Sequence, residues 1–461
     1  MYKRTLSTWD ATLVVAGSMI GSGIFIVSAD IARQVQHPLL LLLVWVITGV
    51  LTLIAALSYG ELAGMMPRAG GQYVYLRESF GPLAGFLYGW TLFTVIQTGT
   101  IAAVAMAFAK FLAVLIPGLG ENVVLSSFSA GGLFTVNLSA AHCVAIACIV
   151  ILTFLNTQGV DVGKWVQRIF TSTKILAVVL LALTGILLGS LWGQNMSQPL
   201  PSISFMTLLP MIAVAMVGSI FSSDAWNNIT FIAAEVKQPE RAIPKGLFFG
   251  VLIVTLMYLA MNVAYLNVLP FTSADVPSMA TAEFDRVGTA AANSIFGQSG
   301  AVIMALLIIV STFGCNNGLI LAGARAYWAM ASDALFFKGA ASLNKAGVPA
   351  KALWIQCVWA SLLCLSGSYG QLLDYVVFAV LIFYVLTILG IFRLRKTQPD
   401  TPRPVKAFGY PVLPALYVIT ALAICGALLQ FKPDYTFPGL IIVATGIPVY
   451  FVWRFVNASR S

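Results

Sequence analysis

Five small residues interrupt the first long apolar stretch of this chain, within the segment AGSMIGSGIF. They are Gly17, Ser18, Gly21, Ser22 and Gly23. Each glycine inside a helix costs about 1 kcal/mol relative to alanine, so this spacing favours a break in the helix. At a break the backbone N–H groups are free and the following half-helix adds partial positive charge, which suits a carboxylate. The alternative is a small-residue face for close helix packing.

Two ionisable side chains lie near the middle of other apolar stretches. Lys174 lies about 16 Å into a stretch that begins near residue 163, close to the centre of a roughly 30 Å hydrocarbon core. A charge at that depth costs about 2.5–3.5 kcal/mol, so the ammonium must meet acceptors. Asp224 lies in the polar segment VGSIFSSDAWNN. It is expected either to cap a half-helix or to select a cationic ligand.

The elements that hold these residues are predicted to be membrane-spanning helices. The chain has 461 residues, of which 59% are hydrophobic and only 9% charged, against about 25% charged in a soluble domain. Apolar stretches recur along the whole sequence and indicate one all-α, polytopic transmembrane domain over 1–461. Twelve spans are predicted, at 9–35, 39–66, 82–116, 139–157, 163–192, 205–236, 243–269, 293–332, 350–368, 372–395, 408–430 and 438–456.

The distribution of charge predicts the orientation of these spans. If the N-terminus is cytoplasmic, most of the 25 lysines and arginines fall on the cytoplasmic side, so both termini are expected there, in the cell (inner) membrane. The net charge of +9 is therefore a topology signal, and no nucleic-acid partner is expected. The six cysteines lie in apolar segments without the spacing of a zinc site, and no metal or cofactor is expected.

The polar interruptions near residues 17–23 and 217–228 occupy matching places in spans 1 and 6. Five spans separate them, so the two helices cross the membrane in opposite directions. Two inverted five-helix units, 9–192 and 205–396, each opening with a broken helix, form a transporter architecture. Two extra helices in 408–456 would follow. An unwound backbone at membrane depth lines a cavity instead of facing lipid.

At this point the chain resembles a known family. The motifs that carry the resemblance are GSMIGSGIF (17–25), SYGELAGMMPRAGGQYVYLRESFGP (58–82), IFTSTKILAVV (169–179), FSSDAWNNITFIAAEVKQPERAIPKGL (221–247) and STFGCNNGLILAGARAYWAMA (311–331). They are similar to those of the amino acid–polyamine–organocation (APC) superfamily, most of all to its L-amino acid transporter (LAT) family, bacterial type. The resemblance implies a LeuT-type fold, a 5+5 inverted repeat with helices 1 and 6 broken.

The resemblance also implies which residues contact an amino acid substrate. They are Met19, Ile20, Ser22, Gly23, Ile24, Phe221 and Asp224. The amides of residues 22–24 would bind the α-carboxylate, and carbonyls near Met19, Ile20 and Phe221 would bind the α-ammonium. Phe221 would in addition be an aromatic lid over the substrate, with a plain core aromatic as the alternative.

A second set of residues is implied in gating and coupling. The ammonium of Lys174 would take the place of the sodium ion of related transporters. It would bond carbonyls near Gly17 and Ser18 and the Ser311–Thr312 stretch. The alternatives for this lysine are a wet crevice without a specific role, or proton coupling through loss of its proton when desolvated.

These expectations describe a sodium-independent exchanger of small neutral amino acids such as alanine and serine, working by alternating access. A proton-coupled symporter, or an exchanger of cationic or larger amino acids, is the alternative within transport. An intramembrane enzyme would need a paired catalytic set that the spans lack, and a channel would need polar residues along a continuous pore. The predicted external loop 117–138 has no cysteine, so no disulfide-linked accessory subunit is expected.

Overall fold

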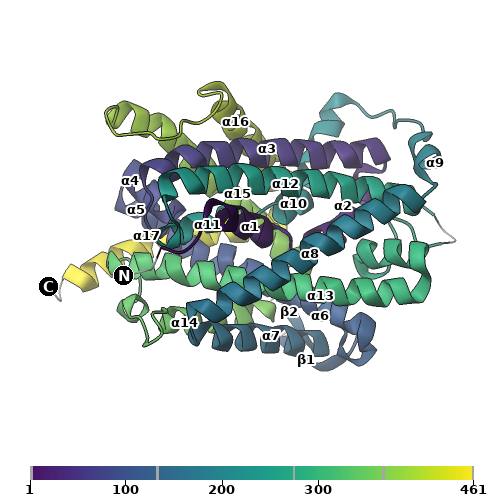
Figure 1. Ribbon diagram of the computed structural model, residues 1–461, viewed down its shortest axis with the longest axis horizontal. Helices are drawn as coiled ribbons and strands as arrows, with labels where there is room; N and C mark the ends of the chain where they lie inside the picture. Colours follow the sequence, from purple (N-terminus) through teal and green to yellow (C-terminus); the bar gives the residue numbers. More distant parts are fainter. Residues whose placement is uncertain (1–3, 131–133, 274–275, 366–368, 459–461) are drawn as a thin grey trace.

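The computed structural model describes residues 4–130, 134–273, 276–365 and 369–458, and most of them are helical (Figure 1). Within these ranges, ten helices are long and apolar enough to cross a membrane. They are Pro38–Met65 (α3), Pro82–Leu115 (α5, η2 and α6), Ala140–Thr157 (α7), Phe170–Leu188 (in α8, Val160–Leu188), Phe205–Ser222 (α10), Pro239–Val268 (α12), Val287–Ser332 (α13), Leu372–Thr397 (in α15, Tyr369–Thr397), Val412–Phe431 (α16) and Thr436–Phe455 (in α17, Pro433–Ala458).

Shorter elements connect or extend these helices. The apolar helix α14, Ala350–Cys364, corresponds to the predicted ninth span. The remaining helical elements are α4 (Gln72–Phe80), α9 (Trp192–Met196), η3 (Pro117–Leu119), η5 (Glu283–Asp285) and η6 (Lys338–Ala341). The fold class of a polytopic helical membrane protein is confirmed, while the count of twelve spans and the boundaries of the two repeats stay predictions.

The predicted breaks in helices 1 and 6 are present. The first apolar stretch divides into α1, Thr8–Met19, a single 3₁₀ turn η1, Gly23–Phe25, and α2, Val27–Val35. The sixth divides after α10, and the chain continues through Ala225, whose φ of 64° no helix allows, into α11, Asn228–Phe231, and η4, Ala233–Glu235. Both breaks are buried, at residues 15–29 and 221–230.

Helices α12 and α13 enclose these breaks. α12 packs against α3, α1 and α8, and α13 packs against α6 and α8. Figure 1 shows α1 at the centre of the bundle, with α12 on one side of it and α13 on the other. The unwound backbone therefore faces protein at mid-bundle, as an interrupted membrane helix must.

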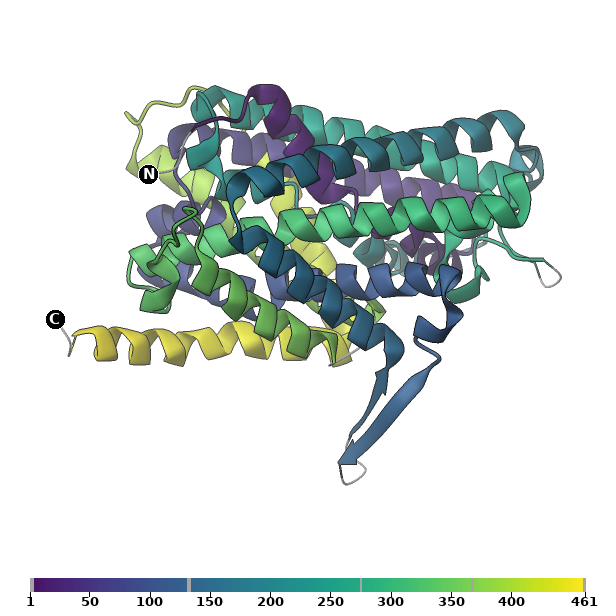
Figure 2. The same ribbon diagram turned by 60° about the horizontal axis from the view of Figure 1, so that its bottom comes forward.

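One element differs from the all-α expectation. The segment between α6 and α7 forms an antiparallel hairpin of β1, Val124–Ala130, and β2, Phe134–Ser139, which projects from the helices (Figure 2). Its backbone groups pair with each other, with Ser127 opposite Asn137. An extramembrane segment can form such a hairpin without helix propensity, so the apolar pattern of the spans gave no signal for it.

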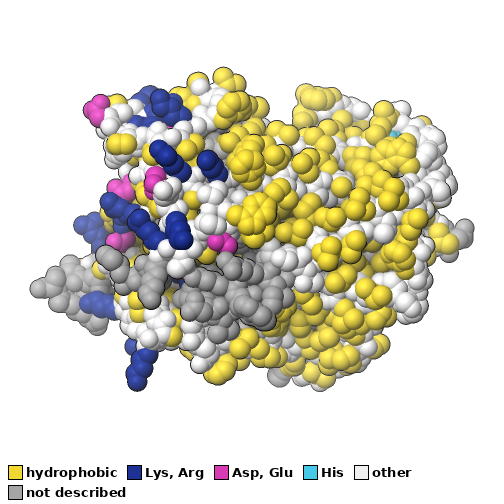
Figure 3. Space-filling model, in the orientation of Figure 1, with side chains coloured by type: hydrophobic (Ala, Val, Ile, Leu, Met, Phe, Trp, Pro, Cys, Tyr) yellow, Lys and Arg dark blue, Asp and Glu magenta, His cyan; other side chains and the backbone are white. Residues whose placement is uncertain are grey.

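Basic side chains gather at one end of the bundle. Figure 3 shows lysine and arginine atoms clustered at the left end, where Figure 1 places both termini, while the rest of the visible face is mainly hydrophobic. We call this the basic end, which includes the start of α12 and the end of α15. The other end, which includes the end of α2 and α9, we call the opposite end.

Candidate functional site

The break in helix 1 presents backbone donors. Ile20 leaves the helix with an extended ψ of 92°, and the 3₁₀ turn begins at Gly23. The amides of Gly23 and Ile24 make no hydrogen bond to any residue that the structure describes. A buried N–H without a partner costs about 1–3 kcal/mol, so this pair of donors is suited to an anionic ligand group.

The carbonyl side of the same break is held by Lys174 from α8. This side chain is fully buried, and its Nζ donates to the carbonyl of Gly17 and to that of Ile20, the latter at 2.8 Å. The lysine is thus placed against the break, as the sequence led us to expect. Its positive charge meets the partial negative charge of the C-terminal end of α1.

Other predicted partners of this lysine lie elsewhere. The carbonyl of Ser18 accepts from Cys315 Sγ at 3.3 Å. Ser311 Oγ is 3.5 Å from the carbonyls of Ile20 and Gly21, so it shares an acceptor with the lysine but is not bonded to it. Thr312 donates to carbonyls in its own helix, at Ile308 and Ile309. The predicted bond from Lys174 to a carbonyl near Gly17 and Ser18 is therefore present, whereas no bond from Lys174 to Ser311 or Thr312 is described.

Two tyrosines of α12 hold further carbonyls of the breaks. Tyr258 donates to the carbonyl of Met19 at 2.9 Å and to that of Ser222 at 3.1 Å, so it joins helix 1 to helix 6. Tyr265 donates to the carbonyl of Ile24 at 3.2 Å. Sequence reasoning missed both residues. Their spacing of seven, which places two hydroxyls on one face of an apolar helix, was the available signal.

The two breaks touch each other at Gly23 and Ser222. A Cβ added to Gly23 would lie 2.1 Å from Ser222 Oγ and 2.9 Å from its Cα. Only glycine permits this approach. Phe221, the preceding residue of α10, is buried, and its carbonyl accepts from the amide of Asp224 at 3.1 Å. Burial agrees with a lid and with a core aromatic alike, so the role of Phe221 stays a prediction.

Asp224 lies at the other side of the helix 6 break. Its carboxylate accepts from the Tyr384 hydroxyl of α15 at 2.5 Å. The residue that precedes α11 is Asn227, and no side chain caps this helix, so the expectation that Asp224 caps the second half-helix was wrong. A left-handed turn at Ala225 directs the chain away before α11 begins.

Asp224 lines a small cavity of about 20 Å³ between the helix 6 break, α6 and α15. Its polar lining includes Asn227, which donates to Gln72 at 2.9 Å, and Asn228, whose buried side-chain nitrogen has no described partner. These groups can bind a ligand side chain through hydrogen bonds, and they were not expected from the sequence.

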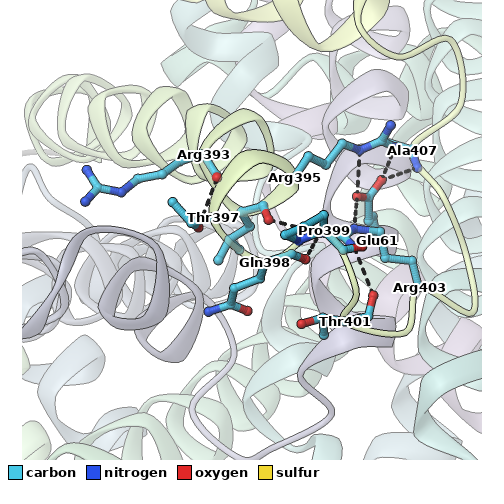
Figure 4. Close-up of polar contacts among 10 residues, drawn as sticks. Glu61, Arg393, Arg395, Thr397, Gln398, Pro399, Thr401, Arg403 and Ala407 are labelled. Atoms are coloured by element: carbon cyan, nitrogen blue, oxygen red, sulfur yellow. Dashed lines mark hydrogen bonds and ion pairs between the residues drawn. The ribbon is translucent and has the colours of Figure 1, made fainter.

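Two groups of ion pairs with buried carboxylates lie at the basic end. Glu61 of α3 binds Arg395 through both carboxylate oxygens, at 2.6 and 3.0 Å, and accepts from the amide of Ala407 at 2.7 Å (Figure 4). Arg403 lies 3.2 Å from the same carboxylate. Glu235 pairs with Arg325 at 2.6 Å.

A further group fixes α4 at the same end. The pKa of the Tyr73 hydroxyl is raised by burial and by the neighbouring Asp333 carboxylate, to which it donates at 2.9 Å. Arg77 also pairs with Asp333. The neutral tyrosine and the charged arginine therefore share one acceptor.

Comparison with known proteins identifies the family to which this chain belongs. The amino acid permease family model matches residues 6–453. The chain belongs to this family. The mouse "Large neutral amino acids transporter small subunit 2" is 28% identical over 461 residues, which cover 98% of this permease and 81% of the relative. The mouse "b(0,+)-type amino acid transporter 1" is 27% identical, covering 95% and 86%. The mouse "Asc-type amino acid transporter 1" is 27% identical, covering 98% and 82%.

The permease is therefore an amino acid transporter and not an enzyme, and its resemblance to the LAT branch of the APC superfamily is confirmed. The bacterial type stays a prediction. The relative named a small subunit is by that name one part of a larger assembly, and it lends no support to the expectation that this chain has no disulfide-linked accessory subunit.

Proposed function

We propose that this permease exchanges small neutral amino acids, such as alanine and serine, without sodium and by alternating access. The observation that carries the proposal is the buried ammonium of Lys174 on the carbonyls of Gly17 and Ile20. A covalently attached cation already neutralises the acceptor side of the helix 1 break, so no dissolved cation is needed there.

The substrate α-carboxylate is assigned to the amides of Gly23 and Ile24, the donors without described partners. Ile20 is a poor acceptor for the α-ammonium, because its carbonyl already accepts from Lys174 and approaches Ser311. A carbonyl has two lone pairs, so the carbonyl of Met19, which accepts from Tyr258, fits the α-ammonium better.

The substrate side chain is assigned to the cavity beside Asp224. The Tyr384 hydroxyl occupies one carboxylate oxygen of Asp224, and the cavity of about 20 Å³ has room for only about one water-sized group, which favours alanine or serine. One observation favours cationic substrates as the second candidate, namely that a buried carboxylate lines this cavity. Proton coupling through Lys174 is the other alternative to exchange.

The orientation belongs to the same proposal. We propose that the permease lies in the cell (inner) membrane. The basic end, with both termini, faces the cytoplasm, because basic residues gather there (Figure 3). The opposite end then faces the exterior.

The test uses purified permease in liposomes loaded with unlabelled alanine. Uptake of labelled alanine, serine, leucine and arginine is measured with sodium and with choline in its place. We expect alanine and serine to exchange rapidly, in either salt, and only when the liposomes are loaded. A strict sodium requirement would refute the role given to Lys174. Uptake into empty liposomes driven by a pH gradient would establish the symporter, and preferred arginine uptake the cationic alternative.

A further inference from the structure

A large cavity lies at the opposite end of the permease, apart from both helix breaks. It is open, has a volume of about 730 Å³, and is lined by the end of α6, the turn after it, and the start of α13 with the chain before it. No residue of either break is among its described lining residues. Charged side chains are concentrated here, although charge is only 9% of the sequence.

Most of the charges around this cavity neutralise each other. Arg286 binds Glu283 at 2.9 Å, and both line the cavity. Next to them, Arg33 of α2 binds Asp285 at 2.7 Å. These two pairs leave their cations and carboxylates little capacity for a ligand.

Two further charges of opposite sign line the cavity without such partners. Lys110 of α6 makes no hydrogen bond or ion pair to any described residue. Glu121 has a buried carboxylate oxygen, Oε1, with no described partner. Both residues line the same cavity, so one ligand can contact both charges. A partly buried charge without a partner is stabilised when a ligand supplies its counter-charge.

The net charge of the residues that line the cavity indicates which class of ligand it can bind. The charged residues that line the cavity are two cations, Lys110 and Arg286, and two carboxylates, Glu121 and Glu283. Their charges sum to zero, so the cavity attracts neither an anion nor a cation strongly. A ligand with both charges and no net charge satisfies the ammonium and the carboxylate together.

We propose that this cavity is a second binding site for zwitterionic α-amino acids, in which Lys110 binds the α-carboxylate and Glu121 the α-ammonium. The site holds substrate at the opposite end before it reaches the helix breaks. The ligand class rests on the proposed function, whereas the site itself rests on the two unpaired charges.

The test compares Lys110→Met and Glu121→Gln with the wild type in membrane vesicles of both orientations. Each variant keeps the length of its side chain and removes one charge. The matched control is Lys432→Met, which also removes one lysine charge, from a pair with Asp374 at 2.9 Å outside the cavity lining.

We expect either cavity variant to raise the apparent KM for alanine about tenfold at one face only, with unchanged maximal rate. The control should leave the KM unchanged. An unaltered KM in both cavity variants, or an equal rise in the control, would overturn the proposal.

Direct binding separates this inference from the proposed function. Labelled alanine is equilibrated with purified permease carrying Gly23→Val, which obstructs the helix breaks. We expect alanine still to bind, and Lys110→Met added to that protein to abolish the binding. Alanine binding that depends on Lys110, in a wild-type permease that shows no exchange, would support this site and refute the exchanger. Exchange by the wild type, with binding that ignores Lys110, would refute this site alone.

Discussion

Replacing Lys174 by methionine removes one charge from the helix 1 break while keeping the side chain nearly as long. The ammonium is fully buried and donates to the carbonyls of Gly17 and Ile20. Two hydrogen bonds from a charged donor contribute about 1.5–3 kcal/mol each, or roughly 3–6 kcal/mol together. Burying a lysine at mid-membrane costs about 2.5–3.5 kcal/mol. These terms largely offset each other in folding, so the variant should fold normally.

The same terms do not offset each other in transport. The cost of burial is present in every conformation that keeps Lys174 in the membrane, whereas the bonds exist only while the helix 1 break lies against α8. If the variant loses about 2.8 kcal/mol of the hydrogen-bond energy that Lys174 contributes, the conformation seen here becomes about 100-fold rarer, at 1.4 kcal/mol for each factor of ten. Exchange must pass through a closed conformation of this kind, so its rate should fall by a similar factor.

The assay is alanine exchange in liposomes, with the folded yield measured by size-exclusion chromatography. Ser311→Ala is the matched control, because it removes a neutral hydroxyl 3.5 Å from the same Ile20 carbonyl. This control should retain at least about half of the wild-type rate, since a bond of that length contributes little. If folded Lys174→Met exchanged within about threefold of the wild type, the assigned role of the ammonium would be refuted.

Four further changes test the rest of the site. Gly23→Ala should lower alanine exchange at least about tenfold, because its Cβ would lie 2.1 Å from Ser222 Oγ, and adding Ser222→Gly should recover part of the rate. Tyr258→Phe should lower the midpoint of thermal unfolding in detergent, since two buried carbonyls lose the one hydroxyl proton that they share, a bond of about 1 kcal/mol. Asp224→Asn should leave alanine exchange within about twofold, whereas loss of arginine uptake alone would establish the cationic alternative. Glu61→Gln should destabilise the folded permease by about 1.5–3 kcal/mol in the same thermal assay, because Arg395 and Arg403 lose the charged acceptor that they share; an unchanged midpoint would contradict this.

The sequence predicted the breaks because glycine and serine inside an apolar stretch contradict its helical pattern, and no packing detail was needed to see this. It also predicted that Lys174 meets the helix 1 break, and the structure shows this contact. The sequence could not select the carbonyls that this lysine meets. A lysine side chain spans several positions, and the rotation of α1 about its axis decides that Gly17 and Ile20, instead of Ser18, face α8.

Other features depended on tertiary contacts between distant segments. Capping by Asp224 was one of two expectations from local spacing, but the left-handed Ala225 turns the chain and brings its carboxylate to Tyr384, 160 positions away. The β1–β2 hairpin arises outside the apolar pattern on which the twelve spans were based. Lys110 and Glu121 were visible in the sequence as charges, but only the folded chain shows that they share one cavity without described partners.

The division of donors and acceptors at the helix 1 break explains why one glycine-rich segment can serve a zwitterion. Scaffold side chains from α8 and α12 occupy the carbonyls of Gly17, Met19, Ile20 and Ile24. The amides of Gly23 and Ile24 have no such partners among the described residues. The break therefore offers donors to a ligand and keeps most of its acceptors bound to the scaffold. On the proposed assignment, a carboxylate would bind these donors beside the Met19 carbonyl, which the Tyr258 hydroxyl joins to Ser222, so one side chain links the ligand site in helix 1 to helix 6.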